Sequence, residues 1–376
     1  MGELHDDSSQ LAQKIADTVV QTFNGLNIKS GKPITRSNGV QEWTVMAGIV
    51  LIQGDTNIPI SICTGVKALP DQVRSYSEGR IVHDLHAEIL CFRAFNRFLI
   101  DECQNRESTL VEKNPDTEKY VLKPHIKVAL FVTEPPCGDA SMGYLSAKTS
   151  NNTPWEIPQE DGAGYKRRKT KTEMVRGRNH FDQLGIVRTK PGRSDSVKTL
   201  SKSCSDKICL KQLVGLNNSI TSQFYEPVYL DFLVLHKTKY HEPDIRRCFD
   251  ERFPITIGKK LKTIVYVKNA YPYEKHEGAV PSPLSLVHMA WRNETQVINN
   301  GVKNGSFIKN RPPNPGGESS LCNKALVKHS MLVYEPKQKT YQELKEAQTD
   351  RNILKKDAKQ LLENWVDTTK DNFLLG

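Results

Sequence analysis

Two short motifs constrain this chain more than any other feature. The tripeptide His-Ala-Glu at residues 86–88 is followed, 51 residues after the histidine, by Pro-Pro-Cys-Gly-Asp-Ala at residues 135–140. Histidine and cysteine are favoured zinc ligands, and a catalytic zinc needs three protein ligands and an open position for water. The motifs supply only His86 and Cys137, because Ala140 stands where a second cysteine would follow at a spacing of three.

The third ligand therefore has to come from elsewhere in the chain. Cys204 is the best candidate, although it lies 67 residues beyond Cys137. With His86, Cys137 and Cys204 as ligands, a bound water could attack the amino-bearing carbon of a base near neutral pH. Glu88 is expected to move protons between the water, the ring nitrogen and the departing ammonia, without binding the metal. The motifs thus predict a zinc-dependent hydrolytic deaminase of a nucleobase.

Local patterns agree with such a site. Apolar residues at helical spacing predict a helix over residues 86–99, with His86 and Glu88 in its first turn. Residues 126–133 are typical of a buried strand, and a second helix is expected to begin at Cys137. Helix N-termini that point at the metal site would stabilise thiolate and carboxylate charge.

The chain as a whole predicts a single domain over residues 1–376. Its predicted elements are a helix at 8–26, a hairpin of strands 43–53 and 59–66, a polar insertion at 101–123, strands at 224–236 and 263–268, a Pro/Gly-rich loop at 310–317, and helix over the last sixty residues. Residues 146–200 form a basic insertion that we expect to be partly mobile.

Composition narrows the class of protein. The eight cysteines show no disulfide-framework spacing, and the sequence shows neither a signal peptide nor an apolar run of about eighteen residues. We therefore expect free thiols and an intracellular protein of the cytoplasm, the nucleus or both, with no membrane contact and no obligate protein partner.

The positive charge is concentrated in one stretch. The chain carries +10, and residues 151–200 hold 11 Lys or Arg against 6 Asp or Glu. The densest part predicts an RNA-contacting run whose candidates are Lys166, Arg167, Arg168 and Lys169. A solvated loop and a nuclear-import signal remain alternatives.

A second basic pattern lies near the C-terminus. Polar residues at offsets 0, 4, 7, 11, 14 and 18 predict one stripe of a single helix, made of Tyr341, Lys345, Gln348, Asn352, Lys355 and Lys359. Such a lysine stripe is ordinarily solvated.

The chain resembles the adenosine deaminases acting on RNA. The resemblance runs from about residue 8 to Phe373 and rests on the two motifs above and, above all, on Ser-Cys-Ser-Asp-Lys-Ile at residues 203–208. It implies an α/β fold, a cytidine-deaminase-like three-layer sandwich with a mixed central sheet and helices on both faces. It also implies that Lys67 contacts RNA near the flipped nucleotide.

The resemblance implies a second cofactor, because enzymes of this family bury inositol hexakisphosphate in the catalytic domain. The matching positions are Arg93, Lys190, Lys207, Ser219, Tyr341, Lys345, Lys355 and Trp365, with Asp84 as a link toward the zinc site. This chain departs from the family's usual basic or aromatic ligands at Phe92, Leu210, Lys211, Asn323 and Thr368, and Lys324 or Lys356 could compensate. Six phosphates would neutralise lysines that could not otherwise be buried.

The resemblance also bears on the RNA substrate. Family members that edit messenger duplexes carry RNA-binding domains ahead of the deaminase, whereas this chain begins almost at the catalytic domain. It is therefore expected to act on tRNA, at position 37 beside the anticodon of alanine tRNA, where flipping an unpaired base costs little. The wobble-position tRNA deaminases keep a close Cys-x-x-Cys, and Ala140 argues against that branch.

Two alternatives stay open. One is deamination of messenger or other structured RNA, or of free nucleosides. The other is a catalytically silent RNA-binding protein, and the presence of Glu88 weighs against it.

Overall fold

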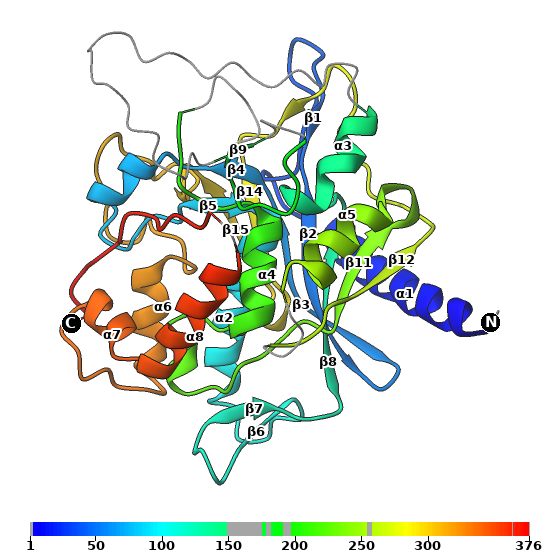
Figure 1. Ribbon diagram of the computed structural model, residues 1–376. Coiled ribbons are helices and arrows are strands. Elements are labelled where there is room, and N and C mark those ends of the chain that lie inside the picture. Colours follow the sequence, from blue (N-terminus) through cyan, green and yellow to red (C-terminus); the bar gives the residue numbers. More distant parts are fainter. Residues whose placement is uncertain are drawn as a thin grey trace, which may run out of the picture.

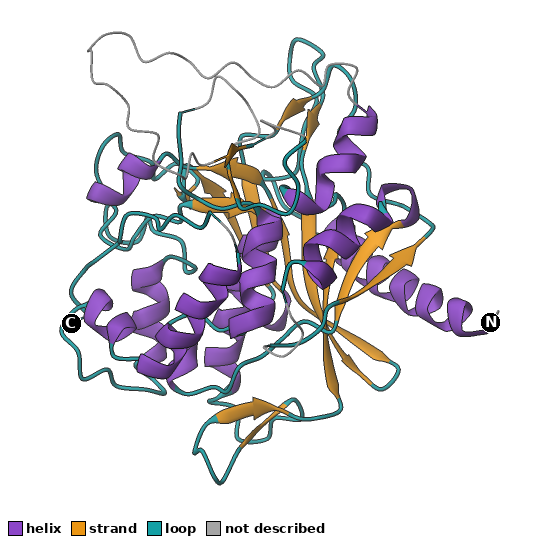
Figure 2. Cartoon of the chain, in the orientation of Figure 1, coloured by secondary structure: helices purple, strands orange, loops and turns teal. Residues whose placement is uncertain are grey.

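The computed structural model describes residues 3–148, 175–177, 182–190, 197–253, 258–362 and 364–375. Its centre is an eight-stranded sheet with the order β12-β11-β8-β2-β3-β14-β15-β16 (Figures 1 and 2). The strands are β2 (Met46–Gln53), β3 (Thr56–Thr64), β8 (Ile126–Val132), β11 (Phe232–His236), β12 (Lys262–Tyr266), β14 (Ser285–Met289), β15 (Glu294–Asn299) and β16 (Val302–Lys303). The sheet is mixed, because β8, β11 and β12 run parallel while the other pairings are antiparallel.

The two faces of the sheet bury different side chains of the same strands. On β2, the side chains of Ala47, Ile49 and Leu51 join the core that contains α2 (Ala87–Glu102). The alternate side chains Met46, Val50 and Ile52 join the core that contains α1 (Glu3–Gly25). This period of two is what a strand buried on both faces requires.

Helices therefore cover both faces, and the predicted three-layer α/β architecture is confirmed. Figure 1 shows α1 alone on one side, with α2 and α4 on the other beside the C-terminal helices. The remaining α-helices are α3 (Met142–Lys148), α4 (Cys204–Val214), α5 (Glu242–Arg246), α6 (Asn323–Ser330), α7 (Tyr341–Glu346) and α8 (Thr349–Leu361). Four two-stranded pairings complete the sheets: β1 (Glu42–Trp43) with β13 (Val280–Pro281), β4 (Val66–Ala68) with β5 (Asp84–His86), β6 (Val111–Lys113) with β7 (Tyr120–Leu122), and β9 (Val175–Arg176) with β10 (Arg188–Thr189).

Most predicted elements are found, with shifted ends. The predicted hairpin is β2 and β3, the predicted strand over 126–133 is β8, and the N-terminal helix begins at Glu3. The strand predicted over 224–236 is wrong in its first half. Residues 224–231 form no strand and make only an isolated bridge between Tyr225 and Tyr120. The strand in this stretch is β11, which begins at Phe232 and pairs with β8 and β12.

The single C-terminal helix predicted from the polar stripe is also wrong. The stripe is split between α7 and α8, and Gln348 lies at the break. The Gln348 side chain donates to the backbone oxygen of Ser219, at 2.5 Å, and accepts from Ser222 Oγ, at 2.5 Å. Asn352 Nδ2 donates to the Lys345 backbone oxygen, at 2.8 Å. Asn352 thus satisfies a carbonyl at the end of α7 that a continuous helix would have bonded with its own backbone, and Gln348 ties the break to the turn at residues 219–222.

The predicted mobile insertion and the basic run at 166–169 fall largely outside the described residues. Within the part of the chain that the structure describes, no helix is both long and apolar enough to cross a membrane. All eight cysteines are free thiols.

Candidate active site

Three predicted ligands converge from three separate segments. The Nδ1 atom of His86 lies 3.8 Å from the Sγ of Cys137 and 3.5 Å from the Sγ of Cys204. The three ligand atoms all lie within 4.8 Å of one another. The 67-residue gap between the two cysteines is therefore closed by the fold.

Local structure explains how each ligand is held. His86 ends β5 and occupies the N-cap position of α2, so the expectation that it lies at the start of that helix holds. Cys204 is the first residue of α4, whose N-cap Ser203 accepts a hydrogen bond from the Asp206 backbone. Cys137 precedes a 3-10 turn, η2 (Asp139–Ser141), which leads into α3, so the predicted helix begins a few residues after the cysteine.

The donor set fits a zinc ion. Tetrahedral coordination with Zn–S of about 2.3 Å and Zn–N of about 2.0–2.1 Å would separate sulfur and nitrogen donors by about 3.6 Å. The two sulfur–nitrogen distances lie on either side of that value. A hydrogen bond from Cys204, with His86 and Lys190 nearby, holds the pKa of the Cys137 thiol well below its ordinary value despite burial. A thiolate is the form that binds a metal.

Glu88 lies beside these ligands on the first turn of α2. It is only 3% exposed, and its Oε2 atom has no hydrogen-bond partner among the described residues. Burial raises the pKa of the Glu88 carboxyl, and the nearby Cys137 adds to the rise, while His86 and Lys190 oppose it. A carboxyl group with a raised pKa and a free oxygen is suited to carry protons.

Asp84 connects the metal ligands to buried lysines. Lys190 Nζ donates to both carboxylate oxygens of Asp84, at 2.8 Å each, and Lys207 Nζ contacts the same carboxylate. Asp84 in turn accepts from the backbone N–H of His86, at 3.1 Å. Although burial opposes ionisation, Lys190 and Lys207 hold the pKa of Asp84 well below its ordinary value. The predicted link toward the metal ligands is thus seen as a chain of contacts.

Behind this link lies a second charged region, which we call the buried cation cluster. Its members are Arg93, Lys202, Lys207, Lys211, Lys345, Arg351 and Lys355, and burial lowers the pKa of every one. The pKa falls to about 7 for Lys211 and to about 8 for Lys202 and for Lys355. For Lys211 the further causes are the charges of Arg351, Lys355, Lys207 and Arg93.

Neutral acceptors, not acids, hold several of these cations. Lys211 Nζ donates to the backbone oxygen of Leu216 and Arg351 to that of Asn217, at 2.8 Å each. Lys202 Nζ lies 5.6 Å from the ring centroid of Trp365, and Lys345 Nζ lies 4.7 Å from that of Tyr341. The contacts of these four cations are therefore with neutral groups, which do not cancel their charge.

The structure thus gathers four of the eight residues predicted to hold the polyphosphate into the cluster, namely Arg93, Lys207, Lys345 and Lys355. Tyr341 and Trp365 contact it, whereas Lys190 is bound to Asp84 beside the metal ligands. Ser219 reaches the break before α8 through its backbone oxygen. Lys356, considered as a replacement, is exposed.

Sequence reasoning missed Lys202 and Arg351 and counted Lys211 as a departure from the family. Arg351 lies ten residues after Tyr341, off the stripe of a continuous helix, and the break at Gln348 changes that phase. Lys202 and Lys211 both lie close in sequence to Cys204, on the segment that closes the metal site.

The predicted RNA contacts are only partly visible. Lys67 lies on β4, which pairs with β5, the strand that ends at His86. Lys67 is opposite Leu85, and the preceding residue, Val66, is opposite His86. Burial lowers the pKa of Lys67, and nearby Arg36 lowers it further. Lys166, Arg167, Arg168 and Lys169 lie outside the described residues.

The family model for the adenosine-deaminase (editase) domain matches residues 61–369, most of the chain and all of the site residues above from Lys67 to Trp365. The chain belongs to the adenosine-deaminase (editase) family. Membership identifies it as an adenosine deaminase, a hydrolase that converts adenosine to inosine, and confirms the resemblance found in its motifs.

Two relatives of this adenosine deaminase extend over almost the whole chain. It is 33% identical to tRNA-specific adenosine deaminase 1 of Schizosaccharomyces pombe, with 98% of both chains aligned. It is 34% identical to the Saccharomyces cerevisiae protein of the same name, over 96% of this chain and 94% of the other. The Drosophila melanogaster double-stranded RNA-specific editase Adar is 29% identical over only 51% of this chain and 29% of its own length.

Proposed function

We propose that this adenosine deaminase acts on tRNA, with zinc held by His86, Cys137 and Cys204 and with Glu88 as the proton carrier. The observation that carries the tRNA assignment is the length of the match. The two yeast tRNA deaminases align over nearly all of both chains, whereas the double-stranded RNA editase aligns over about half of this one.

The chemistry follows from the geometry of the site. Zinc, when bound, would supply an activated water as nucleophile near neutral pH. Glu88 takes a proton from the attacking water and delivers it to the ring nitrogen beside the amino-bearing carbon. A second proton passes to the amino group, so that adenosine and water give inosine and ammonia. The unpartnered Oε2 of Glu88 is available for both transfers.

The substrate position we propose is adenosine 37, beside the anticodon of alanine tRNA. A base in the anticodon loop is weakly stacked, so flipping it into a buried site costs less than flipping a base out of a duplex. We propose that Lys67, which lies next to the strand that carries His86, contacts RNA near the flipped nucleotide. The run at Lys166–Lys169 would add affinity for tRNA phosphates.

We further propose that the buried cation cluster holds inositol hexakisphosphate as a folding cofactor. The proposed ligands are Arg93, Lys207, Lys345 and Lys355, joined by Lys202, Lys211 and Arg351, with Tyr341, Trp365 and Ser219 at its edge. Asp84, which binds Lys190 and accepts from the His86 backbone, would link the polyphosphate site to the metal site electrostatically. Burial and then the repulsion of neighbouring cations depress the pKa of Lys211 and Lys355, and phosphates would offset that repulsion.

The test of the tRNA assignment is direct. Purified protein incubated with total tRNA from cells that lack this activity, followed by sequencing, should produce A-to-G changes at position 37 of alanine tRNA and leave a long messenger-type duplex unedited. Editing of the duplex without any change in tRNA would overturn the assignment. The Glu88→Gln variant serves as the inactive control.

A further inference from the structure

We propose that Arg247 and Arg252 are positioning residues that clamp the two cysteine-bearing turns of the metal site together. The inference rests on the proposed function, because it presumes that Cys137 and Cys204 bind the metal. Both arginines belong to one short segment, the π-helix η5 (Arg247–Glu251) and the residue that follows it. This segment supplies no metal ligand of its own.

The first contact holds the turn of Cys137. Asp139 lies two residues after that cysteine and is fully buried. Arg247 Nε lies 3.1 Å from both carboxylate oxygens of Asp139, and its terminal nitrogen donates to the Asp139 backbone oxygen at 2.7 Å. The same terminal nitrogen also donates to Asp244 Oδ1, at 2.8 Å, which further fixes the guanidinium.

The second contact holds the turn of Cys204 in the same way. Asp206 lies two residues after that cysteine and is also fully buried. Arg252, 4% exposed, donates to Asp206 Oδ1 at 2.8 Å. The other oxygen of Asp206 accepts from Ser203 Oγ at 2.5 Å and from the Arg188 backbone N–H at 2.9 Å.

The π-helical form explains how one segment reaches both turns. An α-helix has 3.6 residues per turn, so residues five apart point to different sides. A π-helix forms i→i+5 hydrogen bonds, which brings residues five apart closer to one side. Arg247 and Arg252 are five apart, and π-turns of this kind are frequent at functional sites.

The two turns are in direct contact with each other. Ser205 Oγ donates toward the backbone oxygen of Cys137, at 2.9 Å, and the Cys204 N–H donates to Cys137 Sγ, at 3.3 Å. Gly138 has a φ of 103°, and a Cβ there would meet Ser203 Oγ at 2.2 Å. A small shift of either turn would therefore change the spacing of the two sulfurs, and the arginines hold both turns against one segment.

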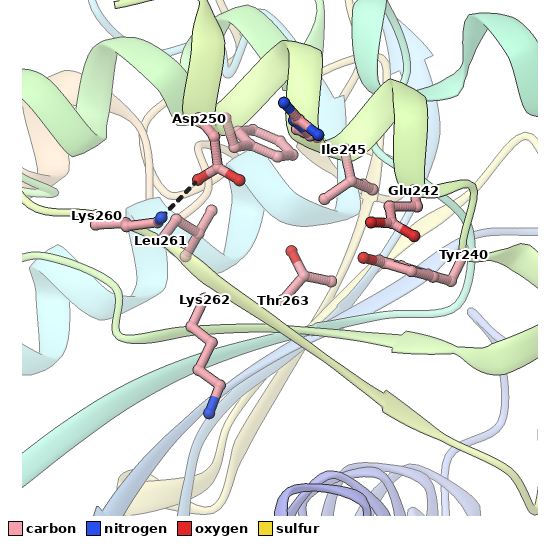
Figure 3. A pocket seen from close by; sticks show the side chains of 10 residues that line it. Tyr240, Glu242, Ile245, Asp250, Lys260, Leu261, Lys262 and Thr263 are labelled. Carbon is pink, nitrogen blue, oxygen red and sulfur yellow. Dashed lines mark ion pairs between the residues drawn. The ribbon is translucent and has the colours of Figure 1, made fainter. Parts of the chain in front are cut away.

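The outer face of the same segment offers a matched control. Together with α5 and β12 it lines a pocket of about 410 Å³, to which Phe249 contributes. Figure 3 shows Ile245 and Asp250 on the helical side of this pocket, facing Lys260 and Thr263. Arg246 also lines this pocket and pairs with Glu251 at a largely exposed site. Arg246 is the last residue of α5, directly before η5, so an Arg246→Met substitution removes a neighbouring arginine that contacts neither cysteine turn.

The test measures metal binding, not turnover. Zinc affinity is measured by competition with a chromophoric chelator for wild type, Arg247→Met, Arg252→Met and Arg246→Met, and each protein is also loaded with Co²⁺ for its absorption spectrum. Loss of an outer contact to metal ligands typically costs 10- to 100-fold in metal affinity. We expect that loss, with altered cobalt bands, in the first two variants and wild-type behaviour in the third.

Conservative variants keep the test decisive if the methionine variants do not fold. Arg247→Lys and Arg252→Lys retain the charge and should recover part of the affinity, with unfolding of the metal-free proteins recorded alongside. Zinc affinity and cobalt spectra equal to those of Arg246→Met in all four variants would overturn the clamp. A wild-type protein that binds no zinc would instead refute the proposed function.

Discussion

The metal-ligand group and the buried cation cluster are adjacent, yet the interactions among their members are opposite in sign. His86, Cys137 and Cys204 hold their ligand atoms within 4.8 Å, tied by hydrogen bonds among themselves. The members of the cation cluster repel one another. The charges of four neighbouring cations add to burial in lowering the pKa of Lys211. Attractive contacts hold the first group together, whereas the second gathers groups of like charge.

The two regions also differ in how easily they can be predicted from a sequence. A zinc site accepts few residue types in fixed chemistry, so short motifs identify it. A polyphosphate accepts any lysine or arginine that reaches it, so its ligands leave no fixed spacing. Asp84 joins the two regions, because it contacts Lys207 of the cluster and the backbone of His86.

The largest effect should come from removing a metal ligand. Cys204→Ala should lose zinc and deaminase activity together, because two ligands cannot hold a catalytic zinc. Metal content by atomic absorption and activity on tRNA check this, with Cys322→Ala, a buried cysteine distant in sequence, as the control. Stoichiometric zinc in Cys204→Ala would show that the third ligand lies elsewhere.

The next effect separates chemistry from metal binding. Glu88→Gln should keep zinc and tRNA affinity while the rate falls by about 10²- to 10⁴-fold, since the amide cannot carry a proton. Single-turnover rates and zinc content measured on the same preparation test both halves. If the variant kept more than about a tenth of the wild-type rate, another group would have to move the protons.

Prediction from the sequence was more complete for the metal-ligand group than for the cation cluster. The convergence of His86, Cys137 and Cys204 was predicted because Ala140 left the motif one ligand short, and the structure brings the three side chains together. That they bind zinc stays a prediction. Arg351 and Lys202 were missed, because their burial depends on how α8 packs on α4, which no local pattern encodes. The break at Gln348 was equally hidden, since its cause is a contact with Ser219 more than a hundred residues away.

The arginines of η5 show a further limit. Asp139 and Asp206 were visible in the motifs, but nothing near them in sequence indicated that both would bind arginines of one segment around residue 250. Contacts of this kind are decided by tertiary packing. They are the part of the site for which a structure is needed.

A third prediction tests the cation cluster through the sign of a stability change. Lys211→Met should stabilise protein refolded without inositol hexakisphosphate, because it removes a buried, repelled cation. With the polyphosphate present, the same substitution should destabilise, by about 3–5 kcal/mol if a buried charge pair is broken. Urea unfolding of wild type and Lys211→Met, with and without the polyphosphate, gives the sign of the change in unfolding free energy in each condition. The same sign in both conditions would contradict the cofactor assignment.

The same cluster predicts a pH dependence. The folded pKa of Lys211 is about 7 without the anion, against an ordinary value of 10.5. Between these values the unfolded chain binds more protons, so the stability of ligand-free protein should rise with pH across that window. Bound polyphosphate should restore the lysine's charge and remove this rise. Lys211→Met should remove the Lys211 contribution even without the ligand, which separates it from the other groups that titrate there.

The smallest effect concerns the basic run outside the described residues. If Lys166, Arg167, Arg168 and Lys169 contact tRNA phosphates, neutralising all four should weaken binding and reduce the slope of log affinity against log salt by up to about 3–4, since each phosphate contact contributes about 0.7–0.9. Neutralising four exposed lysines elsewhere in the chain, Lys14, Lys113, Lys127 and Lys262, controls for net charge. Zinc content and thermal stability should stay unchanged in both variants, because the run would act at long range on RNA and not on either buried region. Equal slopes for the two variants would assign the run to a solvated loop or an import signal.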